Sequence, residues 1–296
     1  MEIPFTKMHS NGNDFVIIDD RQHAVLPPLA GGEIQCLANR HRGVGCDQML
    51  VLSQPTHPEA QEKNIKAQVS IFNGDGSPAT ACGNGMRCVA AFLAKEDPHS
   101  HQVMILQGPL GILKAVYVGG GHVPRVALDA DLPTVHLLDL KSHPIHTHHM
   151  IKNVEVIALV TVGNPHVVVF QNHIERKDAF CKWAPLVAHD LSLERIFQES
   201  TASLLLTGGY NVHAVACVNS TEVHQLIWER GVGMTASCGT GAAAVAVAGV
   251  AAELTASHLT VHQPGGAIDV SWNGQRLMTE GPAVHVFSGL WERNEK

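Results

Sequence analysis

The sequence lacks several features that would mark common classes of protein. Its 296 residues contain no CxxC pair, and the odd total of seven cysteines argues against a disulfide framework and a structural zinc site. The most apolar run, residues 242–252, is too short to cross a bilayer. Residues 1–15 lack the apolar core of a signal peptide, so we expect a cytoplasmic protein.

Positive charge is also scarce. Lys and Arg total 20 against 27 Asp and Glu, which gives a net charge of −7, and no basic cluster stands out. We therefore expect neither a nucleic-acid partner nor a membrane partner. The hydrophobic fraction of 45% is that of an ordinary globular protein, and the length of the chain favours two domains.

One four-residue pattern occurs twice. Residues 82–85 (CGNG) and 238–241 (CGTG) each precede a run of small and apolar residues that predicts a helix. A cysteine in that place lies near unpaired backbone N–H groups and the positive end of the helix dipole, which lowers a thiol pKa and attracts anions. Either motif alone is also typical of an ordinary turn into a packed helix. The recurrence instead suggests two related halves with a ligand site at their interface.

Two matched thiols suit chemistry at a carbon that is approached from both faces. The glycines let the backbone come close to a ligand, so a substrate carboxylate can lie between the two helix N-termini. Cys82 and Cys238 would then face its α-carbon from opposite sides, one as base and the other as acid. The pattern therefore predicts a racemase or epimerase.

The rest of the chain alternates short β-rich segments with turns. A stretch containing Gly and Pro, residues 119–125, predicts a boundary between residues 1–124 and 125–296. Each half then holds several strands and one long helix that begins at its Cys-Gly motif. The expected helices are 86–95 and 240–252, and the expected strands are 15–19, 48–52, 69–72, 103–106, 110–118, 154–162, 167–170, 213–218, 222–228, 259–261, 267–272 and 283–287.

Polar residues just before the cysteines suggest a pocket for a small zwitterion. Asn73 precedes Cys82 by nine residues, and Glu229 and Arg230 precede Cys238 by a similar spacing. Arginine can hold a carboxylate through two parallel hydrogen bonds, while glutamate can accept from an ammonium group. Taken singly, Arg230 is more typical of a solvated surface charge and Asn73 of a turn.

Six segments, in order along nearly the whole chain, carry a family resemblance. They are KMHSNGNDF (7–15), GVGCDQ (43–48), IFNGDGSPATACGNGMRC (71–88), VGNPHVVVF (162–170), ERGVGMTASCGTGA (229–242) and GPAVHVF (281–287). These segments resemble the successive signatures of diaminopimelate epimerase. The resemblance implies a cofactor-independent isomerase that interconverts LL- and meso-diaminopimelate by a two-base mechanism, for lysine and peptidoglycan synthesis.

The resemblance also implies a role for particular residues. The catalytic thiols of the family match Cys82 and Cys238. Its backbone cradle for the reacting carboxylate matches Gly83, Asn84, Gly239 and Thr240. Its recognition of the distal amino-acid end matches Asn73, Asn164, Asn211 and Arg230, with Asn13 and Gln48 lining the same pocket. The polar residues that it places beside the reacting centre match His166 and Glu229.

The fold and partners that the resemblance implies can be stated as expectations. The fold class is α/β (α+β), with two similar domains, each a curved, mostly antiparallel sheet wrapped around a central helix. A strand near residues 284–296 would return to the first domain. We expect no metal and no organic cofactor, and no lysine lies close to either cysteine motif to form a Schiff base with pyridoxal phosphate. The expected partner is a small amino-acid substrate, and a homodimer is a possible assembly.

Two positions depart from the family pattern. Met234 stands where glutamate usually follows ERGVG, and Cys46 stands where phenylalanine is usual. The change at Met234 leaves room for a cofactor-independent racemase of another amino acid. A noncatalytic binding protein or thiol redox protein is a third hypothesis. The retained asparagines and Arg230 favour diaminopimelate, because a monocarboxylate would have less use for them.

Histidine and the other cysteines complete the set of reactive side chains. The chain has 20 histidines, four of which cluster at positions 143, 146, 148 and 149. We expect His143, His146, His148 and His149 to lie in a solvated loop rather than in a metal site. We expect core or incidental positions for Cys36, Cys88, Cys181 and Cys217.

Overall fold

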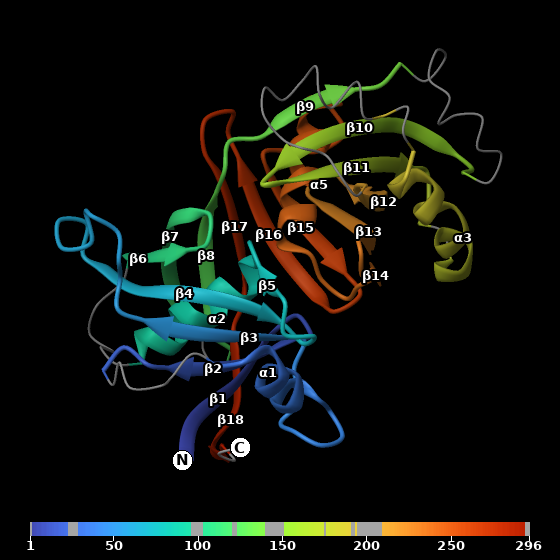
Figure 1. The fold of residues 1–296 in the computed structure, drawn as a ribbon. Helices are drawn as coiled ribbons and strands as arrows, with labels where there is room; N and C mark the ends of the chain where they lie inside the picture. The colour runs from blue at the N-terminus through green and yellow to red at the C-terminus, as the bar shows by residue number, and fades with distance from the viewer. Residues whose placement is uncertain are drawn as a thin grey trace. The chain divides into compact units, whose positions relative to one another are not determined.

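Two compact units make up the protein (Figure 1). The computed structural model describes residues 2–22, 29–95, 103–119, 123–139, 151–174, 176–190, 193 and 209–293. The first unit is Met1–Leu128 with Gly281–Lys296, and the second is Asp129–Glu280. The chain enters the second unit within strand β8 (Arg125–Ala130) and leaves it within β17 (Leu277–Pro282). The boundary expected after residue 124 precedes this division by a few residues.

The first unit is a curved and mostly antiparallel sheet. Its strands pair in the order β18, β1, β2, β3, β4, β6, β7, β8, with only β2–β3 and β4–β6 parallel. The last strand of the chain therefore pairs with the first. The remaining elements of this unit are β1 (Glu2–Ser10), β2 (Asn13–Asp19), α1 (Gly31–Ala38), β3 (Gln48–Ser53), β4 (Ile65–Asn73), β5 (Pro78–Ala79), α2 (Gly83–Ala94), β6 (Val103–Gly108), β7 (Gly111–Gly119) and β18 (Val284–Glu292).

The second unit is built in the same way. Its strands pair in the order β9, β10, β11, β12, β13, β15, β16, β17, with only β11–β12 and β13–β15 parallel. Its elements before β17 are β9 (Thr134–Leu137), β10 (Val154–Val162), β11 (Asn164–Gln171), α3 (Lys177–Ala188), β12 (Asn211–Asn219), β13 (Glu222–Glu229), β14 (Gly233–Met234), α5 (Gly239–Ala251), β15 (His258–Gln263) and β16 (Gly266–Trp272).

The order of pairing is the same in both sheets. From one edge to the other it runs antiparallel, antiparallel, parallel, antiparallel, parallel, antiparallel, antiparallel. Strands β2, β3 and β4 thus correspond to β11, β12 and β13, and α2 corresponds to α5. This repeat confirms the predicted fold of two similar sheet domains.

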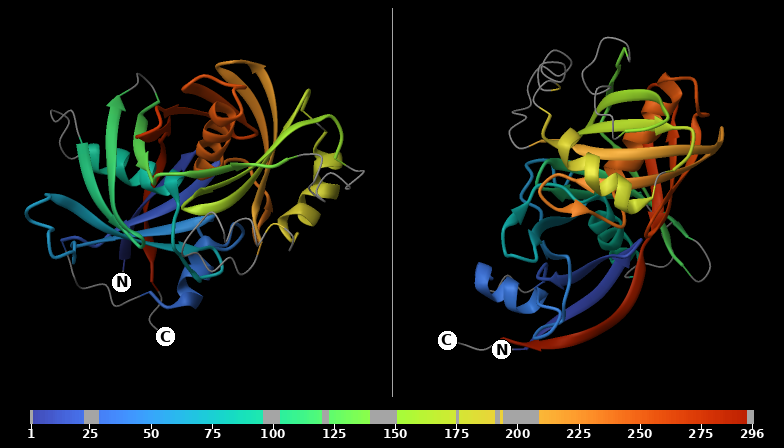
Figure 2. Two further views of the ribbon diagram at one scale, coloured as in Figure 1. Left: turned by 90° about the horizontal axis from the view of Figure 1, so that it is seen from above. Right: turned by 90° about the vertical axis from the view of Figure 1, so that its right-hand side faces the viewer.

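Each sheet curves around one helix. In the first unit α2 contacts β1, β2, β3, β7 and β18, and in the second α5 contacts β9, β10, β11, β12, β15 and β16. Figure 2 shows α5, in orange, inside the curve of its strands. Helix α5 consists of Gly, Thr, Ala and Val, and residues 241–249 are buried, so strands can approach it from several sides. No helix within the described ranges is long and apolar enough to cross a membrane.

The sequence missed elements whose local signals are mixed. Strand β1 contains Pro4, and helix α3 contains Pro185. Proline usually marks an edge strand or the end of a helix, so neither β1 nor α3 was predicted from the sequence. Both central helices also begin earlier than expected, at Gly83 and Gly239, because each cysteine is the N-cap. The other elements without a sequence prediction are α1, β5, β8, β9, β14 and β17. The histidine cluster of residues 143–149 lies outside the described residues.

We predict that alanine cannot replace Gly249 in α5. A Cβ atom there would lie 2.4 Å from Oγ1 and 2.9 Å from Cγ2 of Thr255, so the residues after the helix would have to move. Gly249→Ala should lower the free energy of unfolding in urea by about 1–3 kcal/mol. Gly32→Ala is the control, because a Cβ at Gly32 of α1 meets nothing within 4 Å. An equally stable Gly249→Ala protein would contradict this account of the packing.

Candidate active site

Cys82 is the N-cap of helix α2. Its backbone is extended, with φ −157° and ψ 97°, and its sulfur accepts a hydrogen bond from the Gly85 N–H at 3.3 Å. The side chain is half-buried. The sulfur also lies 3.8 Å from Oδ1 of Asn13, to which the thiol can donate. The turn therefore holds the sulfur beside the first backbone N–H groups of the helix.

The amide of Asn13 is oriented by a carboxylate. Its Nδ2 donates to Oδ2 of Asp47 at 3.0 Å, so its Oδ1 is turned the other way. That oxygen faces Cys82 and also accepts from Nδ2 of Asn84 at 3.4 Å. The Asn84 side chain is itself fixed, because its Oδ1 accepts from the buried Arg87 at 2.8 Å. Asn13 and Asn84 thus form one polar group with the Cys82 thiol.

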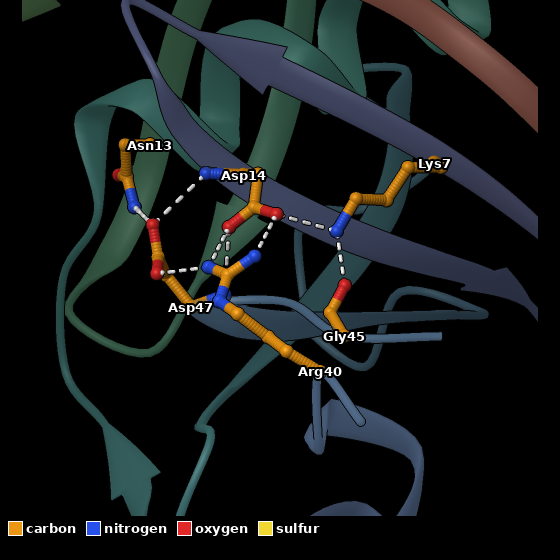
Figure 3. Close-up of polar contacts among 6 residues, drawn as sticks. All are labelled: Lys7, Asn13, Asp14, Arg40, Gly45 and Asp47. Atoms are coloured by element: carbon orange, nitrogen blue, oxygen red, sulfur yellow. Dashed lines mark hydrogen bonds and ion pairs between the residues drawn. The ribbon is translucent and has the colours of Figure 1, made fainter. Parts of the chain in front are cut away.

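A network of charged side chains supports Asn13 (Figure 3). Lys7 contacts Asp14 at 2.6 Å and also donates to the Gly45 carbonyl, while Arg40 contacts Asp14 at 2.7 Å and Asp47 at 2.6 Å. Burial alone would raise the pKa of Asp14, but the hydrogen bonds from Arg40 and Lys7 outweigh it and hold that pKa well below its ordinary value. Asp14 therefore stays ionised at the start of β2.

Gln48 and Asn73 form a second polar pair in the first unit. They are register partners on the antiparallel strands β3 and β4, and Nε2 of Gln48 donates to Oδ1 of Asn73 at 3.0 Å. The other end of the Asn73 amide donates to Oγ of Ser77 at 3.0 Å. Gln48 follows Asp47 directly, so this pair lies next to the network that holds Asn13.

Cys238 is the N-cap of helix α5 and repeats the geometry of Cys82. Its sulfur accepts from the Gly241 N–H at 3.3 Å and lies 3.5 Å from Oγ1 of Thr240. The cysteine is buried. Burial and the nearby Glu229 raise the pKa of this thiol well above its ordinary value, although Thr240 and the Gly241 N–H oppose them. The lowering expected from the helix N-terminus is therefore outweighed by burial at Cys238.

Glu229 and Arg230 stand at the end of β13. Burial raises the pKa of the Glu229 carboxyl, while Thr235 and Cys238 act in the other direction. The Arg230 backbone N–H donates to Oδ1 of Asn211 at 2.8 Å. Its guanidinium makes no ion pair within the part of the chain that the structure describes.

His166 is the third residue of β11 in the second sheet. It is opposite Asn211 in the parallel pair β11–β12, two residues after Asn164, which opens β11. The ring is fully buried, and its Nδ1 lies 2.9 Å from Nε2 of His213. Burial lowers the pKa of His166 to about 3; the Val162 backbone opposes this shift and the charge of Arg230 adds to it. The imidazole is therefore neutral.

The predicted polar residues occupy equivalent places in the two units. Each set lies where strands begin or end. Asn13 and Asn164 open β2 and β11, Gln48 and Asn211 open β3 and β12, and Asn73 and Glu229 close β4 and β13. Gly83 and Asn84 begin α2 as Gly239 and Thr240 begin α5. Each unit therefore gathers its own half of the predicted residues.

Several residues of these sites were missed by sequence reasoning. In the first unit they are Lys7, Asp14, Arg40 and Asp47, and in the second they are His213, Gln225 and Gln263. A signal for the second group exists at His213, which is the one polar residue in the otherwise apolar stretch 212–218 of β12. No cluster of three or more His, Cys, Asp or Glu side chains suited to a metal occurs among the described residues.

The two departures from the family pattern have packing explanations. Met234 pairs with Trp228 across β13 and β14, and both pack against the apolar cluster around α3. Cys46 belongs to the apolar cluster beneath α1, where burial raises its thiol pKa to about 11. Of the other cysteines, Cys88 is buried, Cys217 is half-buried, and Cys36 and Cys181 are exposed.

Comparison with known proteins decides the family. The model of the family described as diaminopimelate epimerase matches residues 5–122 and 158–286. The chain belongs to the diaminopimelate epimerase family. The enzyme of that name from Teredinibacter turnerae is 32% identical over 299 residues, covering 98% of this chain and 99% of the relative. That from Rhizorhabdus wittichii is 34% identical over 289 residues, covering 97% and 95%.

Solved structures support the fold of this family member. A phenazine biosynthesis protein of the PhzF family from Bacillus anthracis has a TM-score of 0.68 at 15% identity, covering 99% of this chain and all of the other. A hydroxyproline epimerase from Agrobacterium vitis has a TM-score of 0.63 at 14% identity, covering 98% and 91%. At these identities the likeness concerns the fold alone.

We predict that Asp14 stabilises the first unit in a pH-dependent way. Asp14→Asn leaves Lys7 without its carboxylate in a largely buried place and should cost about 3 kcal/mol of unfolding free energy near neutral pH. The folded-state pKa of Asp14 lies below the unfolded value. Its contribution is therefore present above about pH 4 and is lost as the pH falls below that value.

Urea unfolding of both proteins at several pH values measures this difference. The difference in unfolding free energy between wild type and Asp14→Asn should become smaller as the solution is acidified. Glu59→Gln, which removes an exposed ion pair with Lys63, is the control and should have no measurable effect. If the difference in unfolding free energy stayed constant down to acidic pH, the charge of Asp14 would not be what stabilises the unit.

Proposed function

We propose that the protein is a diaminopimelate epimerase that inverts one stereocentre of the substrate and interconverts its LL and meso forms. The observation that carries the proposal is the repeated cysteine turn, in which an N-cap sulfur accepts from the third N–H of a helix at 3.3 Å in both units. Membership of the family supports the choice of substrate. The product then serves lysine and peptidoglycan synthesis.

The reaction needs a base, an acid and a stabilised carbanion. An amino-acid α-proton is weakly acidic, so its removal requires strong stabilisation of the developing charge on the carboxylate. The first N–H groups of α2 and α5, at Gly83, Asn84, Gly239 and Thr240, would hold that carboxylate. Such donors are fixed before the reaction begins, so their orientation adds nothing to the barrier.

In the proposed reaction one cysteine removes a proton from the substrate and the other cysteine supplies a different proton to it. A thiolate on one face takes the α-proton, and the thiol on the other face delivers its own proton to the carbanion. After one turnover the two sulfurs have exchanged protonation states, and the reverse reaction uses them in opposite roles. Because burial raises the pKa of Cys238, we propose that this sulfur is the acid in the resting protein and Cys82 the base.

The remaining polar residues would recognise the rest of the substrate. Arg230 is half-buried and its guanidinium makes no ion pair among the described residues, so it can hold the distal carboxylate. Asn73, Asn164 and Asn211, with Asn13 and Gln48, supply amide groups of both polarities for the distal amino acid. We assign Glu229 and His166 to the reacting end. A cytoplasmic location and a homodimer stay predictions.

We predict that each catalytic cysteine is indispensable. Cys82→Ala and Cys238→Ala should each lower kcat by at least about 10²- to 10⁴-fold, because each removes the acid or base for one face. Cys36→Ala and Cys181→Ala alter exposed thiols and serve as controls with normal turnover. The assay follows LL-diaminopimelate without added cofactor, beside a panel of L-amino acids. Substantial epimerisation by either catalytic variant would refute the two-base assignment.

Isotope uptake gives the same assignment a second measurement. In heavy water, deuterium should enter the product well before it enters recovered substrate, since the proton delivered comes from a different sulfur than the one that took the substrate's proton. A single base would label both at similar rates. Similar rates of labelling would therefore contradict the proposed mechanism.

We predict that Arg230 recognises the distal carboxylate by shape as well as by charge. Arg230→Lys keeps the charge but loses the two parallel hydrogen bonds, so kcat/KM for diaminopimelate should fall by about tenfold or more. Arg176→Lys, at an exposed position of the same unit, is the control. A near-normal kcat/KM for Arg230→Lys would remove Arg230 from the binding site.

A further inference from the structure

A continuous chain of buried hydrogen bonds begins at the backbone of Cys238. The Cys238 N–H donates to Oε1 of Gln263 at 3.0 Å, and Nε2 of Gln263 returns a bond to the Cys238 carbonyl at 2.9 Å. Gln263 therefore grips both backbone polar groups of the cysteine. Since its side chain extends from the end of β15, it ties the start of α5 to the sheet.

The chain continues through three more buried side chains. Nε2 of Gln263 also donates to Oε1 of Gln225 at 2.8 Å, and the other end of Gln225 lies 2.9 Å from Nδ1 of His213. Nε2 of His213 in turn lies 2.9 Å from Nδ1 of His166. Gln263, Gln225, His213 and His166 are each at most 7% exposed. The loss of any one of these hydrogen bonds would therefore leave a buried polar group without its partner.

The proton positions along the chain follow from its first link. A backbone N–H can only donate, so the facing atom of Gln263 is its oxygen, and its nitrogen donates to Gln225. The nitrogen of Gln225 must then donate to Nδ1 of His213, which carries its own proton on Nε2 and donates it to Nδ1 of His166. His166 is thereby left with its proton on Nε2.

The series of hydrogen bonds ends at a buried donor, the Nε2–H group of His166. Nε2 of His166 has no hydrogen-bond partner of ordinary geometry among the described residues and is shielded from solvent, although the ring also interacts with the Val162 backbone. Burial lowers the pKa of both histidines, so neither ring carries a second proton near neutral pH. A fixed tautomer is therefore all that the chain of bonds can impose on His166.

The first unit has apolar residues at the corresponding places. Phe15 lies opposite Gln48 as His166 lies opposite Asn211, and Leu50 is the third residue of β3 as His213 is the third of β12. Val69 corresponds to Gln225 by the same registers. At the end of β6, Gly108 corresponds to Gln263. The common fold therefore does not require polar residues here.

The helix start packs on these residues in both units. A Cβ atom at Gly85 would lie 3.2 Å from Leu50 and 3.3 Å from Phe15, whereas one at Gly241 would lie 2.5 Å from Cε1 of His213. In the first unit Gly85 thus packs against Leu50 and Phe15, and in the second Gly241 packs against His213. His213 is therefore part of the surface on which the Cys238 turn packs.

We propose that Gln263, Gln225 and His213 are positioning residues for the epimerisation, which hold the Cys238 turn in place and keep His166 as an Nε2–H donor. This inference rests on the proposed function for its effect on catalysis. The chain reaches the backbone of Cys238 and not its sulfur, so it positions the thiol without carrying its proton. It also makes the surroundings of the two catalytic cysteines chemically different.

Paired substitutions test the proposal by kinetics. His213→Leu installs the residue of the first unit and breaks the chain, and kcat should fall by about 10- to 100-fold with KM little changed. His213→Gln can accept from Gln225 and donate to His166, so it should recover most of that loss. Gln263→Met should also lower kcat, because it releases both backbone groups of Cys238. Gln171→Leu removes a buried glutamine of the same unit that contacts Lys152 and should leave kcat normal.

Nuclear magnetic resonance of histidine-labelled protein tests the tautomers directly. The wild type should show His166 and His213 as neutral rings protonated on Nε2, with signals assigned by their loss in His166→Gln and His213→Gln. His213→Leu should remove the fixed Nε2 tautomer of His166. Protonation of either ring on Nδ1 in the wild type would overturn the proposal, as would equal kcat for His213→Leu and wild type.

The kinetic and nuclear magnetic resonance measurements together distinguish a failure of this inference from a failure of the proposed function. If the wild-type protein did not epimerise diaminopimelate, the proposed function would fail, while the tautomers would still decide whether the chain of bonds is as described. If the wild type were active and His213→Gln were as impaired as His213→Leu, the positioning role would fail alone. Thermal unfolding of every variant shows whether a loss of kcat reflects loss of the fold.

Discussion

The hydrogen bond from the third N–H of a helix to an N-cap sulfur is the contact on which the remaining geometry depends. It sets Cys82 and Cys238 at the starts of α2 and α5 with the same extended backbone. A glycine supplies that N–H in both cases, and its missing side chain lets the neighbouring strands press against the helix start. The curved sheets, the polar residues at strand ends and the thiols are therefore arranged around two short turns.

Identical turns do not give identical thiols. A helix terminus is worth about 0.3–1 kcal/mol to a nearby charge, and up to about 2 in partly buried geometries, whereas full burial can shift a pKa by about 3–5 units. At Cys238 the larger effect prevails, and the thiol resists ionisation. The first unit instead has an ionised network around Asp14 beside its turn, and a half-buried cysteine. The surroundings, not the motif, determine how each sulfur behaves.

The sequence predicted what local signals encode. The cysteine turns, the two central helices and the strands with continuous apolar runs all follow from neighbouring residues, and Pro4 and Pro185 misled where local preference opposed the final packing. The partners of the site residues could not be predicted in this way. Asn13 is oriented by Asp47, and Cys238 is held by Gln263, so both contacts depend on strand registers that join distant segments. Resemblance to a family supplied the candidate site residues but not these contacts.

The return of β18 to the first unit has a consequence for how the chain is made. The second unit is one continuous segment, Asp129–Glu280, whereas the first needs Gly281–Lys296 to complete its sheet. On the ribosome, where domains fold as they emerge, the unit that is synthesised first is therefore the one that finishes last. Until then β1 is an open sheet edge that can pair with another chain. The strand that closes the first unit also ends its exposure to aggregation during synthesis.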